Sequence, residues 1–253
     1  MSTWVLLRGL MRESRHWGEF PQLFQQTVAA QRVVAPDFPG NGSLYLKPSA
    51  DNVNDMVEFL RGHLREQNVA PPYNLLALSL GAMVAVAWSE HYPHELEKMV
   101  LINTSLAPCN PFYHRLRPAN YPALFRQMLF GSSAQREKLV LKLTSNLASH
   151  SLRKQSIVES WINYALRYPV SRANILRQLR AAMGNRASDT APAIPTLLLV
   201  AQQDKLVNAK CSLKLCESWH CDIRIHPTAG HDLPLDDGEW VAKQVKGWLM
   251  TSN

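Results

Sequence analysis

The sequence predicts an α/β protein built on a doubly wound, mainly six-stranded parallel sheet. Six short apolar segments, rich in leucine and β-branched residues, have the composition of strands covered on both faces. Segments with apolar residues at helical spacing lie between them, and this alternation is typical of a parallel sheet. The alternation is interrupted once, over residues 105–187, where helical patterns follow one another without a strand pattern. We therefore expect a helical insertion in an otherwise regular fold.

The expected strands are spread over the chain on both sides of this insertion. They cover residues 3–7, 32–35, 73–78, 99–103, 196–201 and 221–226. The expected helices between and after them cover residues 17–30, 52–68, 81–91, 208–218 and 236–250. The second of these helices opens on Asp51 and continues with apolar residues at helical spacing. With 253 residues, of which 46% are apolar, the chain can bury a large core.

The insertion is expected to form a helical cap over the carboxyl edge of the sheet, where the active sites of α/β proteins form. The predicted division is a core of residues 1–104 and 188–253 and a cap of residues 105–187. Charge supports different roles for the two parts. The net charge of the chain is +7, but residues 105–187 alone carry 13 Lys and Arg against two acidic residues, Glu137 and Glu159.

Composition narrows the class of protein further. The N-terminal stretch MSTWVLLRGLMRES has neither a basic leader nor a long apolar run, so we expect no signal peptide. No apolar run reaches the roughly 18 residues of a membrane span. The four cysteines lack CxxC spacing, which argues against a disulfide scaffold or a zinc site. We expect a cytoplasmic protein with no cofactor and no metal. We also expect no nucleic-acid partner, because the basic segment has no recognition motif.

A serine stands where the third expected strand becomes a helix. The strand ends at Leu78 and Gly81 opens the helix, so Ser79 lies on the turn. The stretch Ala-Leu-Ser-Leu-Gly, with Ala77 first, departs mildly from the G-x-S-x-G pattern of a nucleophile elbow, in which a tight turn lifts the serine clear of the sheet. The alternative is a serine that only caps the helix.

Two further loops carry matching chemistry. Asp204 follows the fifth expected strand, and His231 lies in a loop between the sixth strand and the last helix. Ser, then Asp, then His is the chain order of α/β-hydrolases, and loops beyond the carboxyl ends of parallel strands meet at one edge. Asp232, Asp236 and Asp237 are less suitable acids because they are neighbours of His231 in the sequence. Gly9 ends the first strand, where a following N–H can stabilise an oxyanion.

These residues make the chain similar to the α/β-hydrolase superfamily over nearly its whole length, and PDFPGNG at residues 36–42 resembles a turn of that family. Within it, the chain most resembles small carboxylesterases of the kind that includes the pimeloyl-ACP methyl ester esterase. The resemblance implies Ser79 as nucleophile, His231 as general base and acid, and Asp204 as the group that orients the imidazole. It also implies oxyanion N–H donors at Leu10 and Leu80. The first hairpin of the family is missing, and the expected strand order is 2-1-3-4-5-6.

The chain departs from the family at one position beside the oxyanion turn. The usual His-Gly is Arg8-Gly9 here, and Arg8 either perturbs the turn or places a cation near an anionic substrate. The residues expected to bind substrate are Arg8, Trp17, Phe112, Tyr113 and Trp161, and for the four aromatic residues core or cap packing is an equal alternative.

The resulting hypothesis is a serine hydrolase that cleaves a carboxylic ester through an acyl-enzyme, with a small-molecule ester as substrate. A methyl ester of an acyl carrier protein (ACP) is one candidate, because a basic cap would attract an acidic carrier or another anionic acyl substrate. The alternatives are a thioesterase, a C–C hydrolase or a cofactor-free haloperoxidase. A catalytically silent binding protein on the same scaffold is the alternative outside enzymes, and Arg8 and Ala77 are the features that favour it.

Overall fold

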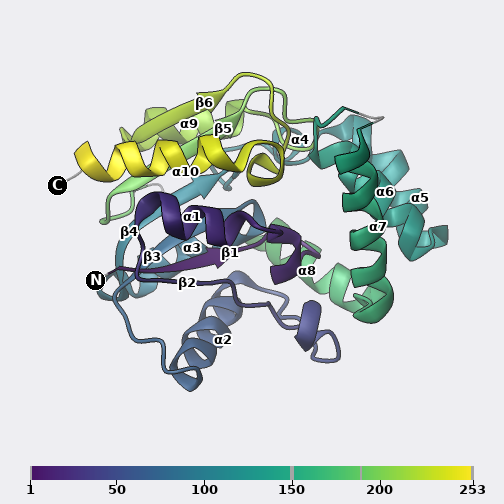
Figure 1. The fold of residues 1–253 in the computed structure, drawn as a ribbon, viewed down its shortest axis with the longest axis horizontal. Helices are drawn as coiled ribbons and strands as arrows, with labels where there is room; N and C mark the ends of the chain where they lie inside the picture. The colour runs from purple at the N-terminus through teal and green to yellow at the C-terminus, as the bar shows by residue number, and fades with distance from the viewer. Residues whose placement is uncertain (1, 149–150, 189, 252–253) are drawn as a thin grey trace.

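The computed structural model describes residues 2–148, 151–188 and 190–251. Six strands form one open parallel sheet in the order β2-β1-β3-β4-β5-β6 (Figure 1). Their bounds are Thr3–Leu7 for β1, Arg32–Val34 for β2, Tyr73–Leu78 for β3, Leu96–Ile102 for β4, Thr196–Ala201 for β5 and Asp222–His226 for β6. The predicted strand order and parallel direction are confirmed.

Helices cover both faces of this sheet. Helices α1 (Phe20–Val28) and α10 (Leu233–Thr251) pack on one face. Helices α2 (Val53–Glu66), α3 (Leu80–His91) and α9 (Lys210–Trp219) pack on the other. Alternate residues of β1, β3, β4 and β5 supply the two cores, as Trp4 and Val5 do in β1, because successive side chains of a strand point to opposite faces. This two-sided burial explains why the central strands are almost wholly apolar.

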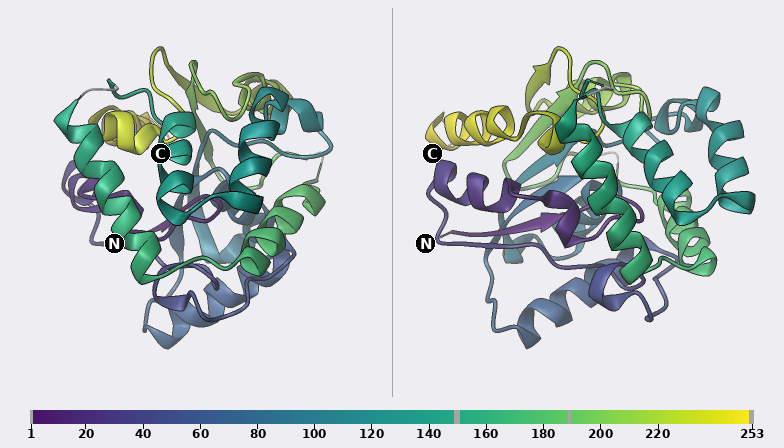
Figure 2. Two further views of the ribbon diagram at one scale, coloured as in Figure 1. Left: turned by 90° about the vertical axis from the view of Figure 1, so that its right-hand side faces the viewer. Right: turned by 45° about the vertical axis from the view of Figure 1, so that its right-hand side comes forward.

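Within the described residues, five α-helices lie between β4 and β5 in the chain, and we call them the helical layer. They are α4 (Phe112–Arg115), α5 (Tyr121–Phe130), α6 (Ser133–Thr144), α7 (Leu152–Arg167) and α8 (Arg172–Gly184). Figures 1 and 2 show them together at one end of the sheet, beyond the heads of the strand arrows. The successive helical patterns in residues 105–187 predicted helices here. The division into a core and a cap as separate units stays a prediction.

Polar contacts attach the helical layer to loops at the carboxyl edge of the sheet. Arg12, in the loop after β1, forms a buried ion pair with Glu137 of α6 at 2.6 Å. Gln178 of α8 accepts the N–H of Met11 at 2.8 Å and donates to Asn41 at 2.9 Å. Each contact joins residues more than 120 positions apart in the chain. Together these contacts hold the helical layer against the loops at the edge of the sheet.

None of the helices in the described part of the chain is both long enough and apolar enough to cross a lipid bilayer.

Candidate active site

Ser79 lies on the turn between β3 and α3 with backbone angles that few non-glycine residues adopt, φ 57° and ψ −114°. It occupies the N-cap position of α3, but its side chain makes no capping hydrogen bond to the helix. Its N–H donates to the carbonyl of Ile102 at the end of β4, at 3.1 Å. The capping alternative therefore does not account for the hydroxyl, and the strained turn is what a nucleophile elbow requires.

Gly81 explains how this turn is possible. A Cβ at Gly81 would lie 2.7 Å from the carbonyl oxygen of Arg8, so only glycine lets the start of α3 approach the end of β1 this closely. Gly9 makes a second close contact between the same two segments, because a Cβ at Gly9 would lie 3.3 Å from the Cβ of Ser79. The end of β1 and the serine turn are therefore in van der Waals contact.

The two predicted oxyanion donors flank this contact. Leu80 is the first residue of α3, where a backbone N–H has no partner within the helix. Leu10 is the second residue of a turn closed by the hydrogen bond from Arg12 N to Gly9 O at 3.2 Å, a position whose N–H the turn itself leaves unused. Met11, the third residue of this turn, has φ 58°. The role of these N–H groups stays a prediction, and the backbone leaves both available for it.

Asp204 and His231 are in direct contact. The Nδ1 of His231 lies 2.6 Å from the Oδ2 of Asp204, and both side chains are buried. The other carboxylate oxygen of Asp204 accepts the N–H groups of Leu206 and Val207, at 2.7 and 2.9 Å. Because the turn after β5 holds one oxygen, the second oxygen has a fixed direction toward the imidazole. This arrangement orients the ring with Nδ1 toward the acid.

The loop that carries His231 is fixed at several points. Asn103, which follows β4 with φ 46°, donates from Nδ2 to the carbonyl of His231 at 2.7 Å. Its Oδ1 accepts the N–H of Ala201 at the end of β5, also at 2.7 Å. A Cβ at Gly230 would lie 2.8 Å from the carbonyl of Thr144, so the loop passes close under the end of α6. Sequence reasoning missed Asn103, whose one signal was a polar residue at the end of the apolar strand expected over residues 99–103.

Electrostatics at His231 favour the imidazolium. Burial lowers the pKa of His231, but the charge and hydrogen bond of Asp204, together with the charge of Asp232, raise it more. The Arg8 guanidinium opposes them, and the net pKa lies above the ordinary value for histidine. A histidine in this setting accepts a proton readily, as a general base in acyl transfer must.

The predicted nucleophile, acid and base thus follow β3, β5 and β6 at the same edge of the sheet. Asp204 and His231 form the pair that the resemblance implies, and Ser79 stands on the strained turn at that edge. Their joint action as a catalytic triad stays a prediction.

Two of the residues expected to bind substrate are buried against partners within the protein. The guanidinium of Arg8 forms a bidentate pair with Asp232 and lies 4.5 Å from the ring centroid of Trp17. Trp17 in turn stacks on Phe20, with the two ring centroids 5.6 Å apart. Sequence reasoning placed Asp232 beside the histidine without foreseeing its partner, which is 224 residues away in the chain.

The other three expected substrate residues have different surroundings. Phe112 and Tyr113 lie on the short helix α4 and are 72% and 48% exposed. Trp161 of α7 is buried, with its ring against that of His16 at a centroid distance of 5.1 Å and the Arg12 guanidinium 4.9 Å from its centroid. Trp161 thus packs α7 on the loop after β1, and contact of these residues with substrate stays a prediction.

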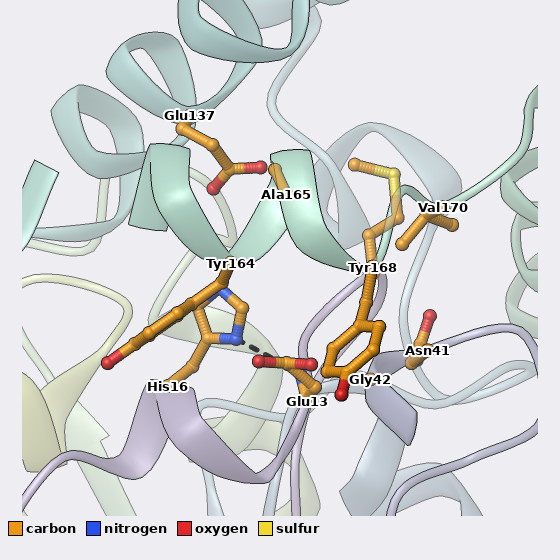
Figure 3. Close-up of a pocket in the computed structure, with 10 residues that line it drawn as sticks. Glu13, His16, Asn41, Gly42, Glu137, Tyr164, Ala165, Tyr168 and Val170 are labelled. Carbon is orange, nitrogen blue, oxygen red and sulfur yellow. Dashed lines mark hydrogen bonds between the residues drawn. The ribbon is translucent and has the colours of Figure 1, made fainter. Parts of the chain in front are cut away.

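A small cavity opens between that loop and α7, as Figure 3 shows. Its volume of about 20 Å³ suits one water molecule and is too small for an acyl chain. Its lining includes Glu13 and His16, whose N–H and Nδ1 are 3.1 Å apart. Burial lowers the pKa of His16 well below the ordinary value, and the Arg12 cation lowers it further. His16 is therefore uncharged at neutral pH.

The open parallel sheet, the strained serine turn and the buried acid–histidine pair together define the α/β-hydrolase class. The chain belongs to the alpha/beta hydrolase family, whose model matches residues 4–244.

Solved structures with the same fold come from several hydrolases. A thermophilic esterase from Thermogutta terrifontis has a TM-score of 0.75 and 20% identity, over 99% of this chain and 90% of the esterase. The 2-hydroxy-6-oxo-6-phenylhexa-2,4-dienoate hydrolase of Rhodococcus sp. strain RHA1 has a TM-score of 0.78 and 18% identity, over 99% and 89%. An enol-lactonase from Burkholderia xenovorans LB400 has a TM-score of 0.80 and 14% identity, over 98% and 91%. At these identities the likeness concerns the fold, and no curated protein matches the chain significantly.

Proposed function

We propose that the protein is a serine hydrolase that cleaves a carboxylic ester through an acyl-enzyme intermediate. The observation that carries this proposal is the buried 2.6 Å contact between His231 Nδ1 and Asp204 Oδ2, at the sheet edge that also bears Ser79. The strained backbone and uncommitted hydroxyl of Ser79 support its role as the nucleophile.

The chemistry follows from these three groups. Ser79 Oγ attacks the ester carbonyl carbon while its proton passes to Nε2 of His231, and Asp204 stabilises the imidazolium through Nδ1–H. The N–H groups of Leu10 and Leu80 stabilise the negative oxygen of the tetrahedral intermediate. The intermediate expels the alcohol, which takes the proton from His231. Water then attacks the acyl-enzyme, giving up a proton to the same histidine, and the carboxylic acid leaves as Ser79 regains its proton.

We further propose that the substrate carries negative charge, either on the acyl group or on a carrier such as ACP. Glu137, one of the two acidic residues in the helical segment, is paired with Arg12 of the core, so it does not neutralise its basic neighbours. Lys138 and Lys142 are exposed one helical turn apart on α6, and Arg126 is exposed on α5. Arg153 and Lys154, also candidates for this role, donate to the carbonyls of Leu235 and Leu147. Uncompensated cations at this end of the sheet would attract an anionic ester.

Hydrolysis of p-nitrophenyl esters from acetate to decanoate, with a thioester and a lactone of matched acyl length, tests the reaction class. Wild type is expected to hydrolyse at least one ester, and Ser79→Ala to lose about 10³-fold or more of kcat. Ser156→Ala, which alters an exposed serine on α7, is the matched control and should keep full activity.

Two outcomes would contradict the proposal. Equal ester hydrolysis by wild type and Ser79→Ala would remove the serine mechanism. Binding of an ester with no turnover in any member of the panel would favour a silent binding protein. A preference for the thioester or the lactone would keep the mechanism and change the substrate class.

A further inference from the structure

A buried ion pair joins the two loops that carry the proposed chemistry. Arg8 Nη1 lies 3.0 Å from Asp232 Oδ1, and Nη2 lies 2.6 Å from Oδ2. The two side chains are only 3% and 4% exposed. Arginine is suited to this contact because its planar group offers two parallel N–H donors to one carboxylate.

Both partners of this ion pair lie next to residues of the proposed catalytic site. Arg8 directly follows β1 and precedes Gly9, which packs on Ser79. Asp232 directly follows His231. Trp17 lies against the guanidinium and restricts its movement. The pair therefore connects the oxyanion turn at the end of β1 to the histidine loop after β6, two segments that are not neighbours in the sheet.

We propose that Arg8 is a positioning residue for the reaction: its pairing with Asp232 holds the Gly9–Leu10 turn against the histidine loop and cancels the charge of Asp232 beside the imidazole. The inference rests on the proposed function, because it assumes that His231 is the general base.

The charges around His231 support the second half of this proposal. Asp204 faces it from the loop after β5, Asp232 belongs to its own loop, and Arg8 comes from the end of β1. Asp236, in the first turn of α10, accepts the N–H of Gly230 at 2.7 Å, and the uncharged carbonyl of Thr144 at the end of α6 accepts the N–H of Asp232, also at 2.7 Å. Asp232 raises the pKa of His231 and Arg8 lowers it, so the pair together changes this pKa less than either charge alone would.

The decisive variant is Asp232→Asn, which keeps the shape of the side chain and leaves the Arg8 cation uncompensated, since arginine does not lose its proton in proteins. The acid limb of the kcat/KM profile against pH should move to lower pH than in wild type. The double variant Arg8→Met/Asp232→Asn removes both charges, and its acid limb should return toward the wild-type position. A purely structural role for the pair would lower activity without this opposite movement.

Arg8→Lys separates charge from geometry. Lysine keeps the positive charge but lacks the two-pronged donor. We expect the acid limb of Arg8→Lys to stay near the wild-type pH while kcat falls several-fold, because the oxyanion turn is less firmly held.

The matched control is Glu95→Gln. Glu95 forms a comparably buried ion pair with Arg61 at 2.8 Å, just before β4 at the amino end of the sheet. Its removal should lower the melting temperature and leave the acid limb unchanged.

The inference is overturned if folded Asp232→Asn has the same acid limb as wild type, or if the double variant moves further from wild type than Asp232→Asn does. If variants at Arg8 do not fold, titration of the His231 ring proton by NMR in Asp232→Asn tests the proposal alone: it predicts a lower pKa of His231 than in wild type, and an unchanged pKa overturns it. Failure of the proposed function has a different signature: Ser79→Ala would retain ester hydrolysis whatever the Arg8 variants do.

Discussion

The two carboxylate oxygens of Asp204 have different hydrogen-bond partners. Oδ1 accepts two backbone N–H groups of its own turn, and Oδ2 accepts from His231. Because its carboxylate is held by the backbone, Asp204 cannot rotate freely. Its hydrogen bond therefore fixes the orientation and the tautomer of the His231 imidazole. The same carboxylate raises the pKa of His231 against the effect of burial. Geometry and proton affinity at the base therefore both depend on one residue.

Asp204→Asn should lower kcat by about 10³–10⁴-fold, because the amide favours the wrong tautomer of His231. The remaining activity should have its acid limb at lower pH than wild type. The Asp204 carboxylate stabilises the imidazolium, so its removal lowers the pKa of His231. The neutral base therefore persists to lower pH.

Stopped ester assays over a range of pH measure both effects. The variant Asp236→Asn serves as a comparison, because Asp236 bonds to the backbone of Gly230 and not to the imidazole. A limb at higher pH in Asp204→Asn would contradict the assignment of the acid.

The sequence alone identified Ser79, Asp204 and His231 as candidates, because each follows a recognisable strand and their chain order suggested one site. It did not predict the contacts of Asn103 or Asp232. Asn103 acts on the main chain of His231, 128 residues away, and Asp232 pairs with Arg8 across almost the whole chain. Contacts of this kind have no local pattern, since they depend on how separate loops meet at the edge of the sheet.

At the scale of elements, the central feature is the packing of α3 on the end of β1. The apolar residues of α3 are buried on all sides, and Gly81 lets its first turn lie against the backbone of Arg8. The backbone of β1 cannot move aside without disturbing the sheet, so a side chain at this position would push the serine turn away.

Gly81→Ala should therefore lower the free energy of unfolding by about 1–3 kcal/mol and reduce activity, as overpacking does in a filled core. Gly62→Ala is the matched control, because a Cβ at that position of α2 would have no neighbour within 4 Å. Alanine there should stabilise the helix by about 0.5–1 kcal/mol. Urea denaturation of both variants compares them, and equal stability would contradict the close contact.

The ion pair between α2 and the start of β4 gives a pH-dependent prediction. Hydrogen bonds from Arg61 and Trp88 lower the pKa of Glu95 to about 2, in spite of its burial. Because this pKa is depressed in the folded state, the stabilisation is fully present above pH 4.5, the ordinary value, and is lost as pH falls toward 2.

Glu95→Gln should lose up to about 3 kcal/mol of unfolding free energy at neutral pH. The difference from wild type should shrink between pH 4.5 and 2. Thermal or urea unfolding at several pH values measures it. A difference that stays constant over this range would show that the charge of Glu95 is not what stabilises the fold.

The elements themselves were largely predictable, and the differences lie at their ends. Strand β4 begins at Leu96, three residues before the expected start, because the charged pair after Leu96 hid the strand pattern. Helix α10 begins at Leu233 instead of residue 236, with Pro234 in its first turn, and is kinked at Asp237. Helix α1 begins at Phe20, after a separate 3₁₀ turn over Ser14–Trp17. Capping and kinks depend on local backbone geometry that apolar periodicity does not encode.

Over the whole molecule, charge is unevenly distributed in the way the sequence indicated. Residues 105–187, which include the helical layer, carry 13 Lys and Arg against two acidic residues, a net charge of +11 compared with +7 for the whole chain. The helices of this layer lie together at the carboxyl edge of the sheet (Figure 2). An excess of one sign near a site raises the local concentration of oppositely charged substrates, and salt removes the effect.

If the helical layer attracts anionic esters, kcat/KM for a carboxylate-bearing ester should fall several-fold between low salt and about 0.5 M salt, while a neutral ester of the same length changes little. Lys138→Glu/Lys142→Glu should weaken the salt dependence. The control Lys214→Glu/Lys246→Glu changes the net charge equally but lies on α9 and α10, and it should behave as wild type. Identical salt responses of the two esters would refute attraction by the layer.

Covalent labelling with a fluorophosphonate tests directly whether Ser79 is an activated nucleophile, because this reagent reacts with a serine only when a neighbouring base activates it. Intact-mass analysis and peptide mapping should find one adduct, on Ser79, with the rate of labelling strongly reduced in His231→Ala. Absence of labelling in folded wild-type protein, or an adduct on another residue, would contradict the role of Ser79 as the nucleophile.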